Sequence, residues 1–328
     1  MELRHVKWLP SDLALVKNAI VERRLLYQPF RFTDELEVGE GQNFYDLYAS
    51  PKRSNFIWNE VPSDLASLQA DDPDHFRSCN SGYRALYDGF LDFIAAKYAG
   101  DLSQLSFAEI GCNTGYFMHG ASLRGAHAAY GFDFTPNYDF TALLNKRLGT
   151  NVTFEFGEWN SLHHRLDHAE MPEVDVVMTM AVLCHMADPM YHLAYLCDHA
   201  RDSILVWTPT NDFVEKNCPM PHWKSDLVLS FGAPRRHPNA LNWPVGFDFN
   251  MRFSVPLLKL CLEEAGFSNI VDIPCPVSEG RWASLYSGFR AVFAKRTSGK
   301  KSALSSFQPR LVPEHIIAAS KARAKEVR

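Results

Sequence analysis

The chain has few of the features that mark a secreted protein, a protein with structural zinc or a membrane protein. Its seven cysteines are odd in number, widely spaced and form no C-x-x-C pair, which argues against a disulfide framework or structural zinc and for reduced thiols. No window approaches the uninterrupted apolar length of a membrane span. The first residues, MELRHVK, carry charges where a signal peptide needs an apolar run. We therefore expect a cytoplasmic protein without a membrane span.

Metal ligands and nucleophile pairs are also scarce. His163, His164 and His168 stand near Asp167, but this spacing matches no standard zinc set and better fits an exposed loop or a helix start. No Ser/His/Asp or Cys/His pattern rises above chance. We expect no bound metal.

Positive charge is scarce in most of the chain and concentrated at its end. The net charge of the 328 residues is −5, but residues 290–328 hold ten basic and two acidic residues, a net +8. The remainder holds 23 basic and 36 acidic residues, a net −13. An acidic body is a poor electrostatic match for nucleic acid. The basic tail leaves contact with RNA or a membrane surface open, although such ends are usually solvated.

The chain lacks the G-x-G-x-x-G spacing of a pyrophosphate-binding turn, and what replaces it is informative. Residues 107–117, FAEIGCNTGYF, indicate a buried strand, a tight turn and the start of a helix, with Gly111 and Gly115 flanking Asn113. Glu109 stands two positions before Gly111. A carboxylate there suits a cationic or hydroxyl-bearing ligand and would repel a pyrophosphate. S-adenosylmethionine (SAM), with its sulfonium, ammonium and ribose, fits, and a nicotinamide dinucleotide does not.

Two further acidic positions follow later strands. Asp133 ends the segment YGFD, 24 residues after Glu109, where a carboxylate can accept both ribose hydroxyls; its alternative role is to cap the next helix. Glu158 and Trp159 follow the third strand and could hold the adenine amino group and stack on the ring. The alternative there is an ordinary loop with a half-buried tryptophan.

Short apolar strands alternating with helices predict a doubly covered α/β fold. We expect a Rossmann-like, seven-stranded, mostly parallel sheet with helices on both faces, because strands of this kind are buried on both sides. The closing pair of strands could be antiparallel. The expected strands are 106–110, 128–133, 152–156, 174–179, 203–208, 269–273 and 288–295, and the expected helices are 11–27 with Ser11 as N-cap, 81–98, 137–148, 189–200 and 255–265.

The regions outside this pattern give the predicted organisation. Residues 1–80 form an N-terminal helical cap, 81–296 the ligand-binding domain, and 297–328 the basic tail. An insertion at 209–249, rich in Pro, His and Trp, follows the fifth strand. Ligands bind at the carboxyl ends of strands in open α/β sheets, so it predicts a substrate-covering loop; a structural excursion is the alternative.

The fourth strand carries the remaining candidates. Met180 lies where the adenine and the sulfur are expected, with a plain core methionine as the alternative. His185 follows in the next turn, and His222 lies in the insertion. A neutral histidine can take a proton from an acceptor hydroxyl, although either could instead be a packed or capping residue.

The E-I-G-C-x-x-G turn, the G-F-D strand end and the segment V-L-x-H-x-x-D-P resemble class I SAM-dependent methyltransferases over roughly residues 81–295. The resemblance implies a seven-stranded sheet whose last strand is antiparallel, and SAM as cofactor. Arg84 could pair with the methionine carboxylate; a surface helix arginine is the alternative. The candidate cofactor-binding residues are Arg84, Glu109, Gly111, Cys112, Asn113, Gly115, Asp133, Phe134, Glu158, Trp159 and Met180, and the candidate catalytic residues are His185 and His222.

Within that superfamily, residues 180–185, MAVLCH, are similar to the M-G-V-L-Y-H of the tRNA wobble-uridine carboxymethyltransferase-like group. The chain departs from the group in two places: residues 77–84 lack its Lys/Trp-rich motif, and Cys184 replaces its tyrosine. These departures favour ordinary SAM over carboxy-SAM. We expect methylation of a small-molecule or sugar-containing acceptor at oxygen, with a tRNA-modifying enzyme and a non-catalytic SAM-fold module as alternatives.

Overall fold

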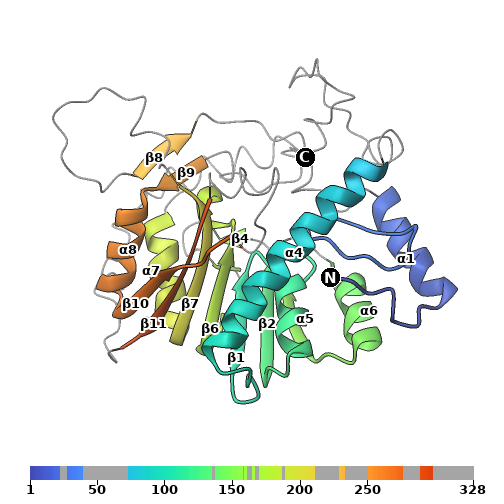
Figure 1. Cartoon of the computed structure of the whole chain (residues 1–328), viewed down its shortest axis with the longest axis horizontal. Helices are drawn as coiled ribbons and strands as arrows, with labels where there is room; N and C mark the ends of the chain where they lie inside the picture. Colours follow the sequence, from blue (N-terminus) through green and yellow to red (C-terminus); the bar gives the residue numbers. More distant parts are fainter. Residues whose placement is uncertain are drawn as a thin grey trace.

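A computed structural model describes residues 1–22, 28–39, 73–134, 137–157, 159–160, 165–166, 170–186, 189–210, 229–232, 250–275 and 289–297. Its centre is a seven-stranded sheet in the order β10-β11-β7-β6-β1-β2-β3 (Figure 1). The strands are β1 (Ser106–Ile110), β2 (Ala128–Asp133), β3 (Val152–Phe156), β6 (Val174–Met180), β7 (Ala200–Pro209), β10 (Phe267–Asp272) and β11 (Phe289–Arg296).

The chain order of the strands creates a switch point in the middle of this sheet. From β1 the chain proceeds outward through β2 and β3, and then returns to place β6 and β7 on the other side of β1. These pairs are parallel, whereas β11 inserts antiparallel between β7 and β10. The expected mostly parallel sheet with an antiparallel last strand is confirmed. A ligand crevice is expected outside the carboxyl ends of β1 and β6, where the direction of winding reverses.

Helices cover both faces of the sheet. α1 (Pro10–Val21), α4 (Pro73–Lys97), α5 (Tyr116–Leu123) and α6 (Tyr138–Leu148) share one buried cluster with the sheet, which also contains Phe107 and Met178. α7 (Pro189–His199) and α8 (Val255–Glu264) pack on the opposite face. Side chains alternate between the two faces of a strand. Glu109 therefore shares the face of Phe107, under α4 and α5.

Three expected helix boundaries were wrong, and proline explains one of them. α1 starts at Pro10, with Leu9 as N-cap in place of Ser11, and the Asp12 carboxylate accepts the Leu9 N–H over 2.8 Å. Proline is favoured at the first helical position, where no N–H is needed. α1 ends at Val21, short of the expected residue 27. α4 starts at Pro73, so the boundary proposed between residues 80 and 81 falls inside a helix.

Short elements lie beside the main sheet. β4 (Trp159–Asn160) pairs with β5 (Arg165–Leu166), and η3 (Leu183–His185) follows β6. β8 (Leu229–Gly232), within the insertion, pairs antiparallel with β9 (Asn250–Phe253), which directly follows the insertion. The rest of the insertion after Thr210 and the tail after Thr297 lie outside the described residues, as do His163, His164, Asp167 and His168. No helix in the described ranges is long and apolar enough to span a membrane.

Candidate functional site

The glycine turn joins β1 to α5 at the switch point. Gly111 N–H donates to the Phe132 carbonyl over 2.7 Å, and Gly115 N–H donates to the Cys112 carbonyl over 2.7 Å. Gly111, Asn113 and Gly115 all have positive φ, at 78°, 49° and 82°. Asparagine tolerates this region better than most residues, and glycine occupies it without steric cost. The turn is therefore a tight, hydrogen-bonded structure and not an open loop.

Close packing explains why Gly111 must be a glycine. A Cβ added there would lie 2.4 Å from Val182 Cγ2, whereas a Cβ on Gly149, which also has positive φ, meets nothing within 4 Å. We expect Gly149→Ala to lower the free energy of unfolding by about 1 kcal/mol, the cost of the left-handed conformation. Gly111→Ala adds an overpacking cost of roughly 1–3 kcal/mol. Denaturant unfolding of both variants measures the difference, and equal losses would contradict the packing argument.

Asp133 ties the end of β2 to the turn. The Asn113 N–H donates to Asp133 Oδ2 over 2.7 Å, and the Asp133 side chain is 4% exposed. The alternative role, capping the next helix, is wrong because Asn137 is the N-cap of α6. A carboxylate has about four lone-pair positions. The bond to Asn113 therefore orients the Asp133 carboxylate at the carboxyl edge of the sheet, beside the glycine turn.

Glu109 is the most unusual side chain at this edge. It is 0% exposed, and neither carboxylate oxygen has a hydrogen-bond partner. Burial raises the pKa of Glu109 well above its ordinary value, and the nearby charge of Asp133 raises it further. Leaving a buried polar group unpaired costs stability, so an arrangement of this kind points to a ligand that supplies the missing donor or positive charge.

Unpartnered polar atoms gather at the same edge of the sheet. Each lies in a buried side chain at or just beyond the carboxyl end of a strand. They belong to Glu109 in β1, Asn137 after β2, Thr179 in β6, and Trp207, Thr208 and Thr210 at the end of β7. Buried polar groups are normally bonded. Among these side chains, Trp207 lies on the same face of the sheet as Glu109, and the two support a polar ligand site at the switch point.

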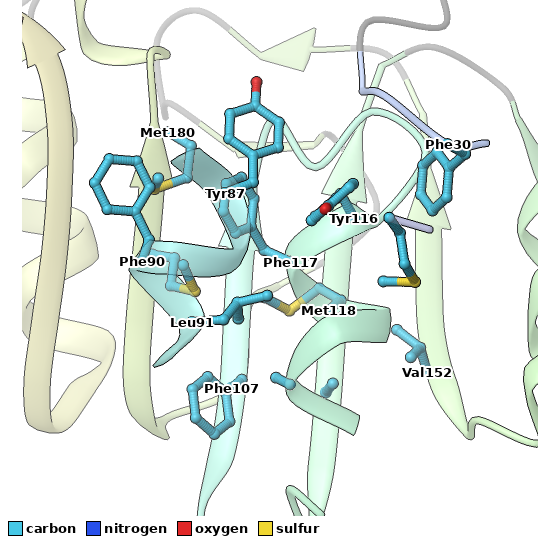
Figure 2. Close-up of a cluster of buried hydrophobic side chains, with 14 of the residues drawn as sticks. Phe30, Tyr87, Phe90, Leu91, Phe107, Tyr116, Phe117, Met118, Val152 and Met180 are labelled. Atoms are coloured by element: carbon cyan, nitrogen blue, oxygen red, sulfur yellow. The ribbon is translucent and has the colours of Figure 1, made fainter. Parts of the chain in front are cut away.

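Helix α4 and the N-terminal segment 28–39 close one side of the site. Tyr87 of α4 is buried in the cluster of Figure 2 and packs against Phe117 with ring centroids 4.7 Å apart. Burial raises the pKa of Tyr87 well above its ordinary value, and the charge of Glu109 raises it further. Arg84 is only 7% exposed and donates to Glu37 Oε2 over 2.8 Å. The surface-arginine alternative for Arg84 is therefore wrong.

Met180 and Trp207 lie at the ends of β6 and β7, in the same buried cluster as α4. Met180 is the last residue of β6, is 6% exposed and is in register with Trp207 on β7. Trp207 packs against Phe289 of β11, with ring centroids 5.0 Å apart. The Cys184 thiol donates to the Ala181 carbonyl over 3.3 Å, and burial raises its pKa to about 12. A thiol with that pKa stays protonated at neutral pH and is no nucleophile.

The structure brings most of the predicted cofactor residues together. Glu109, Asp133 and the turn residues 111–115 form one connected group, in which Cys112 is fully buried and its sulfur lies against Gly131. Phe134 directly follows β2. The backbone of His185 lies in η3, and Trp159 lies in β4. The side chains of His185 and Trp159, together with Glu158 and His222, lie outside the described part of the chain.

Sequence reasoning missed several residues of this region. Gln28 contacts the turn from the N-terminal segment, and Asn137 and Trp207 contribute the unpartnered atoms noted above. The sequence did contain a signal for Asn137, because it lies between the strand that ends at Asp133 and the helix that follows. Gln28 had none, since it lies 88 residues before its partner Tyr116.

No family model matches the chain, and no curated protein is similar to it. Solved structures with a similar fold include a magnesium protoporphyrin IX methyltransferase from Synechocystis PCC 6803 with bound S-adenosylhomocysteine (SAH), at 15% identity over 66% of this chain and 87% of that chain, with a TM-score of 0.44. The N-terminal domain of EvdMO1, with SAH and D-fucose, is 17% identical over 64% and 83%, with a TM-score of 0.45. The [4+2]-cyclase SpnF is 14% identical over 65% and 81%, with a TM-score of 0.41.

These identities and scores are low, and the similar structures include a cyclase as well as methyltransferases. One fold can host different reactions, so what this chain binds depends on its own site. Its strand order, antiparallel last strand and glycine turn define a Rossmann-like α/β protein with a candidate ligand site at the switch point.

Proposed function

We propose that the protein is a SAM-dependent methyltransferase. The observation that carries the proposal is the buried, unpartnered carboxylate of Glu109 beside the glycine turn, one strand away from Asp133. The ammonium and sulfonium groups of SAM would give the Glu109 carboxylate a positively charged partner, and the ribose hydroxyls would donate to Asp133. A pyrophosphate would instead bring negative charge next to two carboxyl groups. The residues at this edge therefore fit SAM.

Each side chain has a proposed role in holding the cofactor. Asp133 accepts the ribose hydroxyls, Glu109 pairs with the ammonium group, and the turn 111–115 presents its backbone. Met180 packs against the adenine and the sulfur. Glu158 and Trp159 hold the adenine amino group and ring, Phe134 lines the ribose, and Arg84 pairs with the methionine carboxylate, for which it must share its guanidinium with Glu37.

The cofactor's sulfonium supplies an activated methyl group, and the protein's part is alignment. The acceptor must approach the methyl carbon in line with the departing sulfur, and a correctly held pair can supply much of the rate enhancement without further groups. Where the acceptor is a hydroxyl, His185 or His222 takes its proton. We propose oxygen as the methylated atom and a small or sugar-containing molecule as the acceptor. The net charge of −13 outside the tail supports an acceptor other than nucleic acid.

A tRNA-modifying enzyme is the second candidate, because residues 290–328 carry a net charge of +8. Deletion of residues 297–328 separates the two. If the substrate is RNA, the wild type binds RNA with a steep salt dependence that the deletion reduces. Absence of RNA binding by the wild type at low salt supports the small-molecule acceptor.

Titration calorimetry with SAM and SAH tests the cofactor directly. We expect the wild type to bind both, because Glu109 and Asp133 contact groups that the two molecules share. If the wild type binds neither, even at concentrations far above usual cellular cofactor levels, the proposed function is wrong. Cofactor binding without turnover of any acceptor would instead favour a non-catalytic module.

A further inference from the structure

Gln28 reaches the glycine turn from far away in the sequence. Its Oε1 accepts the Tyr116 N–H over 2.7 Å and the Thr114 hydroxyl over 3.1 Å. Gln28 is 4% exposed. Tyr116 is the first residue of α5, so the side-chain oxygen of Gln28 lies at the N-terminus of this helix.

The N-terminus of the helix after a glycine turn is the position that binds phosphate in dinucleotide-binding folds, because its free N–H groups and the helix dipole attract anions. Here the amide oxygen of Gln28 takes that position. It is a neutral acceptor, so it satisfies the Tyr116 N–H without adding charge near Glu109 and Asp133.

The segment that carries Gln28 is firmly packed. Phe30 lies 5.3 Å from the ring of Tyr116 and 6.0 Å from that of Phe140, between centroids, and belongs to the buried cluster of Figure 2. The Asn80 side chain donates to the Val38 carbonyl over 3.3 Å, and Arg84 pairs with Glu37. These contacts hold both ends of residues 28–39 against α4 and α5. The position of Gln28 is therefore supported by its neighbours on both sides.

We propose that Gln28 determines the class of cofactor that this turn accepts: it occupies the phosphate position at the N-terminus of α5 and positions the turn for an adenosyl sulfonium compound. The positioning of the turn for an adenosyl sulfonium compound rests on the proposed function. The exclusion of pyrophosphate does not depend on it.

Two variants and one matched control test this role by calorimetry. Gln28→Ala removes the acceptor and opens the space. We expect about tenfold weaker SAH binding, because the Tyr116 N–H loses its partner and the turn relaxes. We also expect inorganic pyrophosphate to bind Gln28→Ala more tightly than the wild type, because the freed N–H groups at the start of α5 offset part of the repulsion by Glu109 and Asp133. Gln28→Glu keeps an acceptor oxygen at the same reach but adds negative charge near Glu109 and Asp133. We expect its SAH affinity to lie between those of Gln28→Ala and the wild type, and we expect it not to bind pyrophosphate.

Thr33→Ala is the control for general loosening of the segment. Thr33 Oγ1 accepts the Glu35 and Leu36 N–H groups within residues 28–39 and does not contact the turn. It should leave SAH binding unchanged and pyrophosphate unbound. If Gln28→Ala behaves like Thr33→Ala with both ligands, Gln28 has no role in cofactor choice.

Gln28→Asn supplies the same test if Gln28→Ala fails to fold, because its amide is one methylene shorter and cannot reach both donors. We expect weakened SAH binding, and unchanged binding would overturn the positioning role. A wild type that binds no SAH refutes the proposed function, whereas pyrophosphate binding by the Gln28 variants still decides the exclusion role by itself.

Discussion

Asp133→Ala should weaken SAH binding by about a hundredfold, because two hydrogen bonds from ribose hydroxyls to a charged acceptor are lost at a buried site. The same change removes the acceptor of the Asn113 N–H, so the turn also loses a bond of 2.7 Å. Titration calorimetry measures the affinity, and circular dichroism shows whether the variant keeps its fold.

Asp133→Asn separates the two roles of this side chain. Its amide oxygen can still accept the Asn113 N–H, so the turn is kept, but the charge and one acceptor oxygen are lost. We expect a loss of affinity about midway, on a logarithmic scale, between wild type and Asp133→Ala, since charged hydrogen bonds are roughly twice as strong as neutral ones. If Asp133→Ala binds SAH as the wild type does, the ribose assignment is wrong.

Glu109→Gln should have opposite effects on binding and on stability. The change removes the charge that pairs with the cofactor's ammonium group, and we expect about thirtyfold weaker binding of SAM, in the range for a charged hydrogen bond. In the free protein it removes a buried acid without a partner. We therefore expect the free variant to be more stable than the wild type at neutral pH.

The pH dependence of stability follows from the raised pKa of Glu109. Its ordinary value is 4.5, and burial raises it in the folded state. As pH rises above about 4.5, the unfolded chain releases this proton while the folded protein still holds it. The unfolded state then binds fewer protons, so the free energy of unfolding falls with pH until folded Glu109 ionises. Glu109→Gln should lack this fall, which denaturant unfolding at several pH values would reveal.

Proton release gives a second measurement on the same residue. Binding of a cationic group lowers the pKa of Glu109, because opposite charges favour the ionised form. Wild-type protein should therefore release protons when it binds SAM below the raised pKa, and calorimetry in buffers with different ionisation enthalpies detects them. Equal proton release by wild type and Glu109→Gln would mean that Glu109 does not face the cofactor's charge.

Local patterns in the sequence predicted much of the fold. β1, β2 and β3 have the expected bounds, because an apolar run of five or six residues between turn residues can form few structures other than a buried strand. The glycine turn was equally legible, since Gly111, Asn113 and Gly115 are residue types that tolerate positive φ. Glu109 and Asp133 followed from their offsets to that turn, and the structure connects both to it.

The sequence did not predict the contacts that complete the site. Nothing in the neighbourhood of Gln28 indicates that its amide oxygen meets the Tyr116 N–H, and nothing near Arg84 indicates its partner Glu37. Likewise, no local pattern in the sequence indicates that β11 pairs with both β7 and β10.

The difference between what the sequence predicted and what it did not has a physical cause. Helix and strand periods, turn conformations and proline positions depend on backbone geometry over a few residues, and the sequence alone determines them. Which segments then pair depends on burying apolar faces and satisfying polar groups across the whole chain. The sequence by itself determined the seven strands of the main sheet and the glycine turn with its two acidic neighbours. Only the tertiary structure decided that Glu109 is buried without a partner and that Gln28 occupies the phosphate position.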